Sequence, residues 1–248
     1  MRRLEGRSAI VTGAGRGFGA EIAELFAREG ARVAASDVDG PSADATARRI
    51  VEAGGDAFGL QADVTSVPDA ERLVEAAVER FGGLDVLVNN AGIASAGTIC
   101  EVAEEEWDRV MAINVKGTYL CSRYAVGSMA ASGGGSIVCV ASASGVIGQR
   151  GQVAYNVSKH AVIGMVRCMA LDHAVDGIRV NAVCPGTMRT PMLDALTAEQ
   201  LAALEAMHPL GRLGDPAEIA QTVLHLAADE SSFTTGAVFL VDGGLTAQ

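Results

Sequence analysis

Short apolar runs alternate with longer amphipathic stretches from one end of the chain to the other. The run over 84–88 is almost continuously apolar, as expected for a strand of a parallel sheet that is covered on both faces. Similar runs predict strands over 8–12, 32–36, 57–62, 84–88, 136–140, 179–183 and 238–241. Helical periodicity predicts helices over 17–29, 41–53, 67–81, 153–175 and 216–228, and helical stretches between 104 and 131 that break near Asn114.

This alternation of β and α segments predicts one α/β domain over residues 1–248. We expect a Rossmann-like, doubly wound sheet of about seven parallel strands with helices on both faces. No linker, internal repeat or low-complexity segment divides the chain. Hydrophobic residues make up 49% of it but aromatic residues only 4%, so the core has to be built from aliphatic side chains.

The net charge of −11 argues against nucleic acid or an anionic membrane as a partner, because both require a basic surface. No apolar segment is long enough to predict a membrane span, and no apolar segment follows the basic start as in a signal peptide. The scattered cysteines lack metal-site spacing, so we expect no metal site. Buried free thiols would suit a cytoplasmic protein; the cysteines are Cys100, Cys121, Cys139, Cys168 and Cys184.

A glycine-rich loop follows the first expected strand, at the start of the first expected helix. Glycines permit a tight turn and a close backbone approach, and the helix N-terminus offers free N–H groups to a pyrophosphate. Taken alone, such a loop could also be only a tight turn. Its candidate cofactor-binding residues are Gly13, Gly15, Arg16, Gly17, Phe18 and Gly19.

Asp37 ends the second expected strand, where a carboxylate would hydrogen-bond the ribose 2′-hydroxyl of a dinucleotide. The same carboxylate would repel a 2′-phosphate, so it favours NAD over NADP. Arg16 argues in the other direction, because a cation there could reach a 2′-phosphate. Asp37 carries more weight because it would occupy the site directly, and Asp39 adds negative charge nearby.

Tyr155 and Lys159 are four residues apart on an expected helix, so the phenol and the ammonium share one face. The chain contains only one other lysine, Lys116, among seventeen arginines. Lysine offers a compact ammonium that can relay a proton, which a guanidinium does not. A cation beside the phenol favours tyrosinate, so the pair is a candidate general acid/base.

Three further polar positions are ambiguous when each is considered alone. Ser142 follows the strand over 136–140, in the position where α/β sheets bind ligands, and Ser144 competes with it for a role on a substrate oxygen. Asn114 could simply satisfy backbone groups at a helix break. The segment from Asn89 to Gly92 could be an ordinary turn, since Asn and Gly dominate turns.

Together these pieces resemble the short-chain dehydrogenase/reductase family in order and spacing, over essentially the whole chain. The thirteen-residue step from Ser142 to Tyr155 fits the family as well. The resemblance is carried by Thr12-Gly-x-x-x-Gly-x-Gly19, Asp63-Val64, Asn89-Asn90-Ala91-Gly92, Asn114, Ser142, Tyr155-x-x-x-Lys159 and Pro185-Gly186.

The resemblance also implies a role for each matching residue. The catalytic group would be Asn114, Ser142, Tyr155 and Lys159. The cofactor would be bordered by Asp63 and Val64 at the adenine, by Asn90, Ala91 and Gly92 at the adenosine ribose, by Ile113, and by the loop from Pro185 and Gly186 to Thr190 at the nicotinamide carboxamide. Tyr155 and Lys159 would also contact the cofactor, Lys159 through the nicotinamide ribose.

The implied reaction is hydride transfer between NAD(H) and a secondary alcohol or ketone. Tyr155 would remove the alcohol proton, while Ser142 would hold the same oxygen and stabilise its developing charge. Asn114 would position a water that connects Lys159 to solvent.

The segment 187–214 resembles the substrate-covering lid of the family. Its apolar residues could roof a substrate or pack as an ordinary helix, and Arg150 and Arg189 could meet a polar substrate or remain surface charges. The apolar residues are Met188, Met192, Leu193, Leu196, Leu201 and Leu204. The resemblance also implies a homotetramer formed through the helices over 103–131 and 153–175 and through the C-terminal strand.

Two other functions stay open. An NADPH-dependent 3-oxoacyl-(acyl-carrier-protein) reductase is similar around Gly151 and Gln152, but Asp37 and the lack of basic residues between Tyr124 and Ile137 argue against it. A nucleotide-sensing regulator without turnover could have lost the catalytic residues, and here all four positions are filled. A methyltransferase would have no use for Tyr155 and Lys159.

Overall fold

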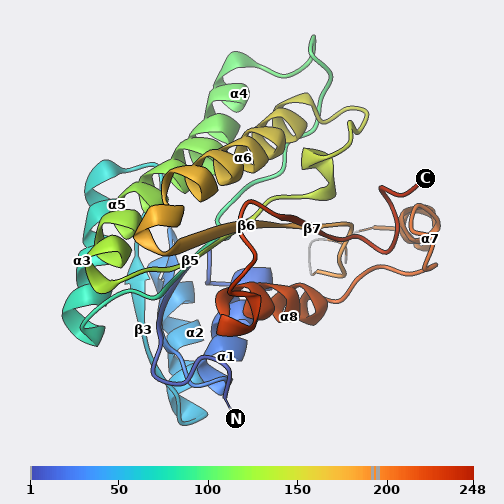
Figure 1. Cartoon of the computed structure of the whole chain (residues 1–248). Coiled ribbons are helices and arrows are strands. Elements are labelled where there is room, and N and C mark those ends of the chain that lie inside the picture. The colour runs from blue at the N-terminus through green and yellow to red at the C-terminus, as the bar shows by residue number, and fades with distance from the viewer. Residues whose placement is uncertain (1, 191–192, 194–195) are drawn as a thin grey trace.

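The computed structural model describes residues 2–190, 193 and 196–248. A single sheet of seven parallel strands crosses the molecule in the order β3-β2-β1-β4-β5-β6-β7 (Figure 1). The order reverses between β1 and β4, the place where doubly wound sheets open a ligand crevice. The strands are β1 (Ser8–Thr12), β2 (Arg32–Asp37), β3 (Asp56–Gln61), β4 (Val86–Asn89), β5 (Gly135–Val140), β6 (Ile178–Pro185) and β7 (Val238–Val241).

Helices cover both faces of the sheet (Figure 1). One aliphatic core lies under α1 (Gly17–Arg28), α2 (Gly40–Glu52) and α8 (Pro216–Ala227). The other lies under α3 (Val67–Phe81), α5 (Gly117–Ser132) and α6 (Val153–Asp172), with α4 (Glu104–Met111) against α6. The short helix α7 (Ala198–Ala206) stands outside both layers, and none of its side chains is fully buried.

The predicted fold class is confirmed, and most predicted elements differ from the observed ones only at their ends. The expected break near Asn114 is a change of helix type and not an interruption of the helix. The backbone stays helical from Met111 through Gly117, and Ala112–Lys116 form a π-helical turn between α4 and α5. A π turn inserts one extra residue without ending the helix, and such turns are frequent at functional sites.

The expectation of buried thiols holds for only three of the five cysteines. Cys100 and Cys168 are exposed, whereas Cys121, Cys139 and Cys184 are buried. Burial raises the pKa of Cys121 to about 12 and the pKa values of Cys139 and Cys184 to about 11. These three thiols are therefore protonated at neutral pH.

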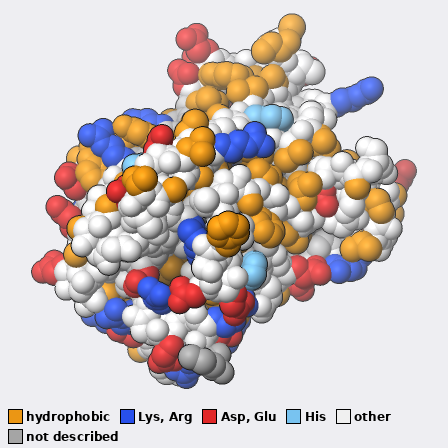
Figure 2. Space-filling view, in the orientation of Figure 1, with side chains coloured by type: hydrophobic (Ala, Val, Ile, Leu, Met, Phe, Trp, Pro, Cys, Tyr) orange, Lys and Arg blue, Asp and Glu red, His pale blue; other side chains and the backbone are white. Residues whose placement is uncertain are grey.

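The surface mixes charged and apolar side chains, with hydrophobic groups spread over the face that carries α6 and the edge strand β7 (Figure 2). Across the ranges that the structure describes, none of the helices combines the length and apolarity needed to cross a bilayer.

Candidate active site

The residues singled out by the sequence gather at the carboxyl ends of the strands. The glycine-rich loop follows β1, Asp37 ends β2, Asn90 follows β4, Ser142 follows β5 and Gly186 follows β6. Because the strands are parallel, all these ends share one edge of the sheet. The sheet therefore brings together residues that are far apart in sequence.

Side chains of neighbouring segments hold the glycine-rich loop in place. Nδ2 of Asn90 donates to the carbonyl oxygens of Thr12 and Gly13, at 2.9 and 3.0 Å. The Thr12 hydroxyl oxygen accepts from the backbone N–H groups of Asn90 and Ala91, both at 3.1 Å. Gly13 has a positive φ of 63°, and a Cβ there would lie 2.9 Å from Cα of Ala91. The loop thus requires glycine where it meets the end of β4.

The start of α1 is open to an anion. Its N-cap residue, Arg16, makes no side-chain capping bond, and the first turn contains no acidic residue. The first N–H groups of a helix have no partner within the helix, so here they can bind a pyrophosphate. Arg16 itself is exposed.

Asp37 faces the same loop. Its Oδ2 accepts from the backbone N–H of Gly15 at 2.9 Å, and its Oδ1 accepts from that of Asp39 at 3.0 Å. A Cβ on Gly15 would lie 2.9 Å from Asp37 Oδ2, so the close approach depends on glycine. Asp39 instead caps α2: its Oδ1 accepts from the Ser42 backbone N–H at 3.4 Å, and its Oδ2 accepts from the Ser42 hydroxyl at 2.6 Å. An uncapped helix start, a glycine cradle and a carboxylate at the end of β2 fit a dinucleotide.

Tyr155 and Lys159 lie one turn apart on α6. Lys159 Nζ is 5.7 Å from the centroid of the Tyr155 ring and donates to the Val140 carbonyl oxygen at 2.9 Å. The lysine is only 6% exposed, and no carboxylate among the described residues pairs with it. The ammonium is thus buried beside the phenol at the end of β5.

Asn114 links three segments around this pair. From the π-helical turn, its Oδ1 accepts from the Ile93 N–H at 2.8 Å, and its Nδ2 donates to the Ile93 carbonyl at 2.9 Å and to the Ser158 hydroxyl oxygen at 3.0 Å. Ser158 in turn donates to the Tyr155 carbonyl at 2.7 Å. A Cβ on Gly92 would lie 3.2 Å from Asn114 Oδ1 and 3.4 Å from Lys159 Nζ. The glycine thus leaves open the space between these two groups.

The two candidate serines differ in what their hydroxyls do. Ser142 is 9% exposed, and its oxygen accepts from the Ser144 N–H at 3.1 Å. Ser144 is 2% exposed and donates its own hydroxyl proton to Oε1 of Gln149 at 2.8 Å. Within the described chain the Ser142 hydroxyl has no acceptor for its proton, so it is the one free to bind a substrate oxygen.

The remaining predicted cofactor contacts lie after β3, at the end of β6 and beyond it, and in the π-helical turn. Asp63 is exposed and accepts from the backbone N–H and the hydroxyl of Thr65, both at 2.8 Å. Val64 is buried against Gly117, and Ile113 is half-buried at the core under α5. Pro185 ends β6, and the loop that follows contains Gly186 and Thr190; the Gly186 N–H donates to the Val241 carbonyl at 3.0 Å.

The lid residues do not behave alike. Met188 is buried in the core beside Gly214, so it is no part of a roof. Leu193, Leu196, Leu201 and Leu204 are half-buried, and Met192 lies outside the described residues. Arg150 is exposed, while Arg189 pairs with Glu205 on α7 at 3.3 Å.

Sequence reasoning missed several residues that shape this region. Ser158, Gln149 and the buried His208 each make side-chain bonds to groups that border the predicted site. Of these three, only Ser158 could have been found from the sequence, because it lies beside Lys159 in the Tyr-x-x-x-Lys motif. The partners of Gln149 and His208 depend on how the loops fold.

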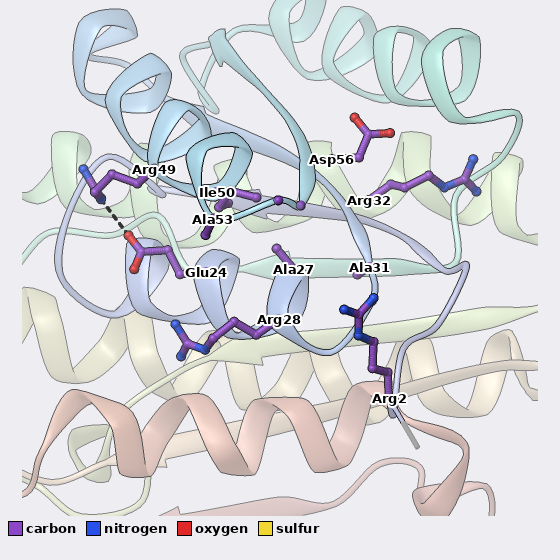
Figure 3. A pocket seen from close by; sticks show the side chains of 13 residues that line it. Arg2, Glu24, Ala27, Arg28, Ala31, Arg32, Arg49, Ile50, Ala53 and Asp56 are labelled. Carbon is purple, nitrogen blue, oxygen red and sulfur yellow. Dashed lines mark hydrogen bonds and ion pairs between the residues drawn. The ribbon is translucent and has the colours of Figure 1, made fainter.

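A separate cavity of ≈ 320 Å³ lies at the opposite, amino-terminal ends of β2 and β3 (Figure 3). Four arginines line it, but each guanidinium already has a partner. Arg49 pairs with Glu24 at 2.8 Å, and Arg32 donates to two backbone carbonyls. Arg28 and Arg2 pair more loosely with nearby glutamates. This cavity is therefore not part of the candidate site.

Comparison with known proteins points to one group of enzymes. The family model described as enoyl-(acyl carrier protein) reductase matches residues 13–246. The chain is 41% identical to 2-(S)-hydroxypropyl-CoM dehydrogenase 3 of Xanthobacter autotrophicus, over 99% of this chain and 98% of that protein. It is also 41% identical to 3-oxoacyl-(acyl-carrier-protein) reductase of Thermotoga maritima, over 98% and 99%. The crystal structure of a short-chain type dehydrogenase/reductase from Mycobacterium marinum superposes with a TM-score of 0.94 at 36% identity, covering 99% of this chain and 97% of that one.

Proposed function

We propose, since the chain is an oxidoreductase of the short-chain dehydrogenase/reductase family, that it transfers a hydride between NAD(H) and a secondary alcohol or its ketone. The observation that carries this proposal is the meeting of three groups at the end of β5. Lys159 is anchored on Val140, Tyr155 lies one turn away on α6, and Ser142 follows two residues after Val140.

In the oxidative direction, Tyr155 takes the proton of the substrate hydroxyl while Ser142 donates a hydrogen bond to the same oxygen. The hydroxyl proton of Ser142 has no other acceptor within the described chain, which supports this role. A donor is needed here because the substrate oxygen becomes more negative as the substrate proton leaves. Bound NAD would accept the hydride from the carbinol carbon and leave a ketone. Lys159 then passes the phenol proton towards the space at Gly92 and Asn114. Ketone reduction uses the same groups in reverse.

We infer that NAD, rather than NADP, is the preferred cofactor. Asp37 presents a carboxylate at the cradle formed by Gly15, and a 2′-phosphate there would be repelled. The exposed Arg16 is the group that would support NADP.

We infer that the substrate is a small secondary alcohol or ketone beneath a lid over 187–214. The half-buried leucines of the lid suit an apolar substrate portion. A 3-oxoacyl group on a carrier protein is the second candidate, because the Thermotoga relative at 41% identity has that name. Against it stands the lack of basic residues between Tyr124 and Ile137, where an acidic carrier would need to dock.

We also infer a cytoplasmic homotetramer. Helix α6 carries an apolar stripe whose last residues are almost fully exposed: Leu171 at 80% and, just after the helix, Val175 at 90%. Val157, Gly164 and Cys168 lie on the same face by helical spacing. The edge of β7 is open as well, with Leu240 exposed. Apolar surfaces of this kind are typical of subunit contacts.

The test is a screen of secondary alcohols, hydroxy acids, sugars and steroids that follows nicotinamide absorbance with NAD and with NADP. We expect turnover with NAD that Tyr155→Phe lowers by about 10²–10⁴-fold, while NADH binding stays close to wild type. Tyr124→Phe is the matched control and should retain activity. Undiminished turnover in Tyr155→Phe would overturn the mechanism, and better rates with NADP would overturn the cofactor assignment.

A further inference from the structure

His208 is a buried imidazole, 3% exposed, that the reaction above does not use. Its Nε2 lies 3.1 Å from the backbone nitrogen of Thr187, and its Nδ1 lies 2.8 Å from the carbonyl oxygen of Leu204. A backbone N–H can only donate and a carbonyl can only accept. Both bonds therefore form only in the neutral tautomer that carries its proton on Nδ1.

The ring is held in a narrow slot. A Cβ on Gly186 would come within 2.9 Å of Nε2, and one on Gly243 would come within 3.4 Å of the His208 Cβ. The neighbouring Asp242 does not compete for the ring. Its carboxylate accepts from the N–H groups of Gly244 and Thr246 and from the Thr246 hydroxyl, at 2.7 to 3.0 Å.

The two bonds of His208 join the end of α7 to the start of the segment 187–214. Leu204 is in the last turn of α7, within the lid, and Thr187 is in the loop after β6. The loop is fixed on its other side by backbone bonds from Gly186 to Val241 and from Gly214 to the Thr187 carbonyl, at 3.0 and 3.1 Å. A cavity of ≈ 420 Å³ borders His208 between the lid and the end of β7, so packing there is incomplete.

We propose that His208 is a positioning residue that ties lid helix α7 to the loop over 186–190 and holds this loop in its cofactor-binding conformation. This inference rests on the proposed function, because the nicotinamide end of the cofactor is expected at this loop. The residue acts through the Thr187 backbone and touches neither substrate nor the reacting atoms.

Two substitutions separate the two bonds. In His208→Gln the side-chain oxygen reaches about as far as Nε2, so it can still accept from Thr187. In His208→Asn the amide reaches about as far as Nδ1, so it can still donate to Leu204 but leaves the Thr187 N–H without an acceptor. Both variants lose the ring, so a purely space-filling role would affect them alike.

Three measurements test the proposal. Amide hydrogen exchange of a peptide containing Thr187 should be about tenfold faster in His208→Asn than in wild type, and close to wild type in His208→Gln. The Kd for NADH, from fluorescence titration, should rise about tenfold in the Asn variant and less than about threefold in the Gln variant, with kcat affected less than KM. Equal effects in the two variants, or none in either, would overturn the positioning role.

The third measurement uses the wild-type protein, so it does not depend on whether a variant folds. In ¹⁵N-edited spectra of the wild-type protein, the His208 ring should carry its proton on Nδ1 and none on Nε2; a proton on Nε2 would refute the bridge. If wild-type protein does not bind NADH, the proposed function fails. The exchange and the spectra would still decide whether His208 holds the loop.

Discussion

Lys159 and Val140 are joined by a hydrogen bond of 2.9 Å, in which the buried ammonium donates to the last carbonyl of β5. Strand β5 leads directly to Ser142, so one strand end fixes both the candidate serine and the lysine of α6. An ammonium has three N–H donors, and only one is used within the described part of the chain. The other two remain available for a ribose hydroxyl and for a water near Gly92.

Replacing this lysine should remove activity in a way that charge alone cannot restore. We expect Lys159→Met to lower kcat by about 10²–10⁴-fold, because the Tyr155 phenol loses the cation beside it and the phenol proton loses its route to solvent. Lys159→Arg should not recover the activity, since a planar guanidinium is too wide for the space of a buried ammonium. Steady-state kinetics on each variant checks this. Lys116→Met is the matched control: among the residues that the structure describes, its exposed ammonium donates to the Thr65 carbonyl alone, so kcat should not change.

The two serines after β5 should separate in kinetics. Ser142→Ala removes the hydroxyl that has a free proton, and we expect kcat/KM to fall about 10²–10³-fold, as for loss of one preorganised donor. Ser144→Ala loses only its bond to Gln149, which should cost about 1 kcal/mol of unfolding free energy and less than about tenfold in kcat/KM. Kinetics and thermal unfolding on the same samples measure both effects. A larger kinetic loss in Ser144→Ala would reverse the assignment.

The strands and their terminal site residues could be predicted because the information is local. A strand buried on both faces is apolar almost throughout, as Ser8–Thr12 and Val86–Asn89 are, and the loop that follows it begins with polar or glycine residues. Parallel pairing then places these loops at one edge without any further information. The placement of Asp37, Asn90 and Ser142 at one edge of the sheet was foreseeable for this reason.

Other features depend on contacts between distant segments. The π-helical turn at Ala112–Lys116 keeps the helical pattern of its flanks, so the sequence suggested a break instead. The sequence leaves Met188 open between a roof over the substrate and core packing; it is buried in the core because Gly214 has no side chain in its way. His208 precedes a proline in what looks like a turn, and its partner Thr187 is twenty-one residues away. No local sequence pattern predicts such a bond.

Cofactor choice should depend on Asp37 and not on its neighbour. We expect Asp37→Asn to raise the ratio of kcat/KM for NADP to that for NAD by about 10–100-fold, because a 2′-phosphate no longer meets a carboxylate. The matched change Asp39→Asn keeps a residue that caps α2 well, so the ratio should stay within about threefold of wild type. Initial rates with both cofactors decide the question. An equal shift in the two variants would mean that general negative charge, not the Asp37 site, sets the preference.

Assembly should depend on the apolar stripe of α6. A charged side chain at Leu171 would have to be buried in any contact formed through this stripe, which costs several kcal/mol. We therefore expect light scattering to give a tetramer for wild type and smaller species for Leu171→Glu. Val51→Glu is the matched control, because Val51 is also exposed but lies on α2, away from the stripe. A monomer in wild type, or no change in Leu171→Glu, would exclude this interface.

The cysteines provide an independent measure of the same assembly. At pH 8, a thiol whose pKa is about 11 is ionised in about one molecule in a thousand, and burial also excludes the reagent. Cys121, Cys139 and Cys184 should therefore react with a thiol reagent only after unfolding, which gives five reactive groups in denaturant. Cys100 is exposed in the segment between β4 and α4, outside the stripe, and should react rapidly in every variant. Cys168 lies on the stripe, so the proposed tetramer should protect it in wild type and in Val51→Glu but not in Leu171→Glu. Equally rapid labelling of Cys168 and Cys100 in wild type would show that α6 is not covered in solution. Labelling of Cys139 in the native protein would contradict the burial of this thiol under the candidate site.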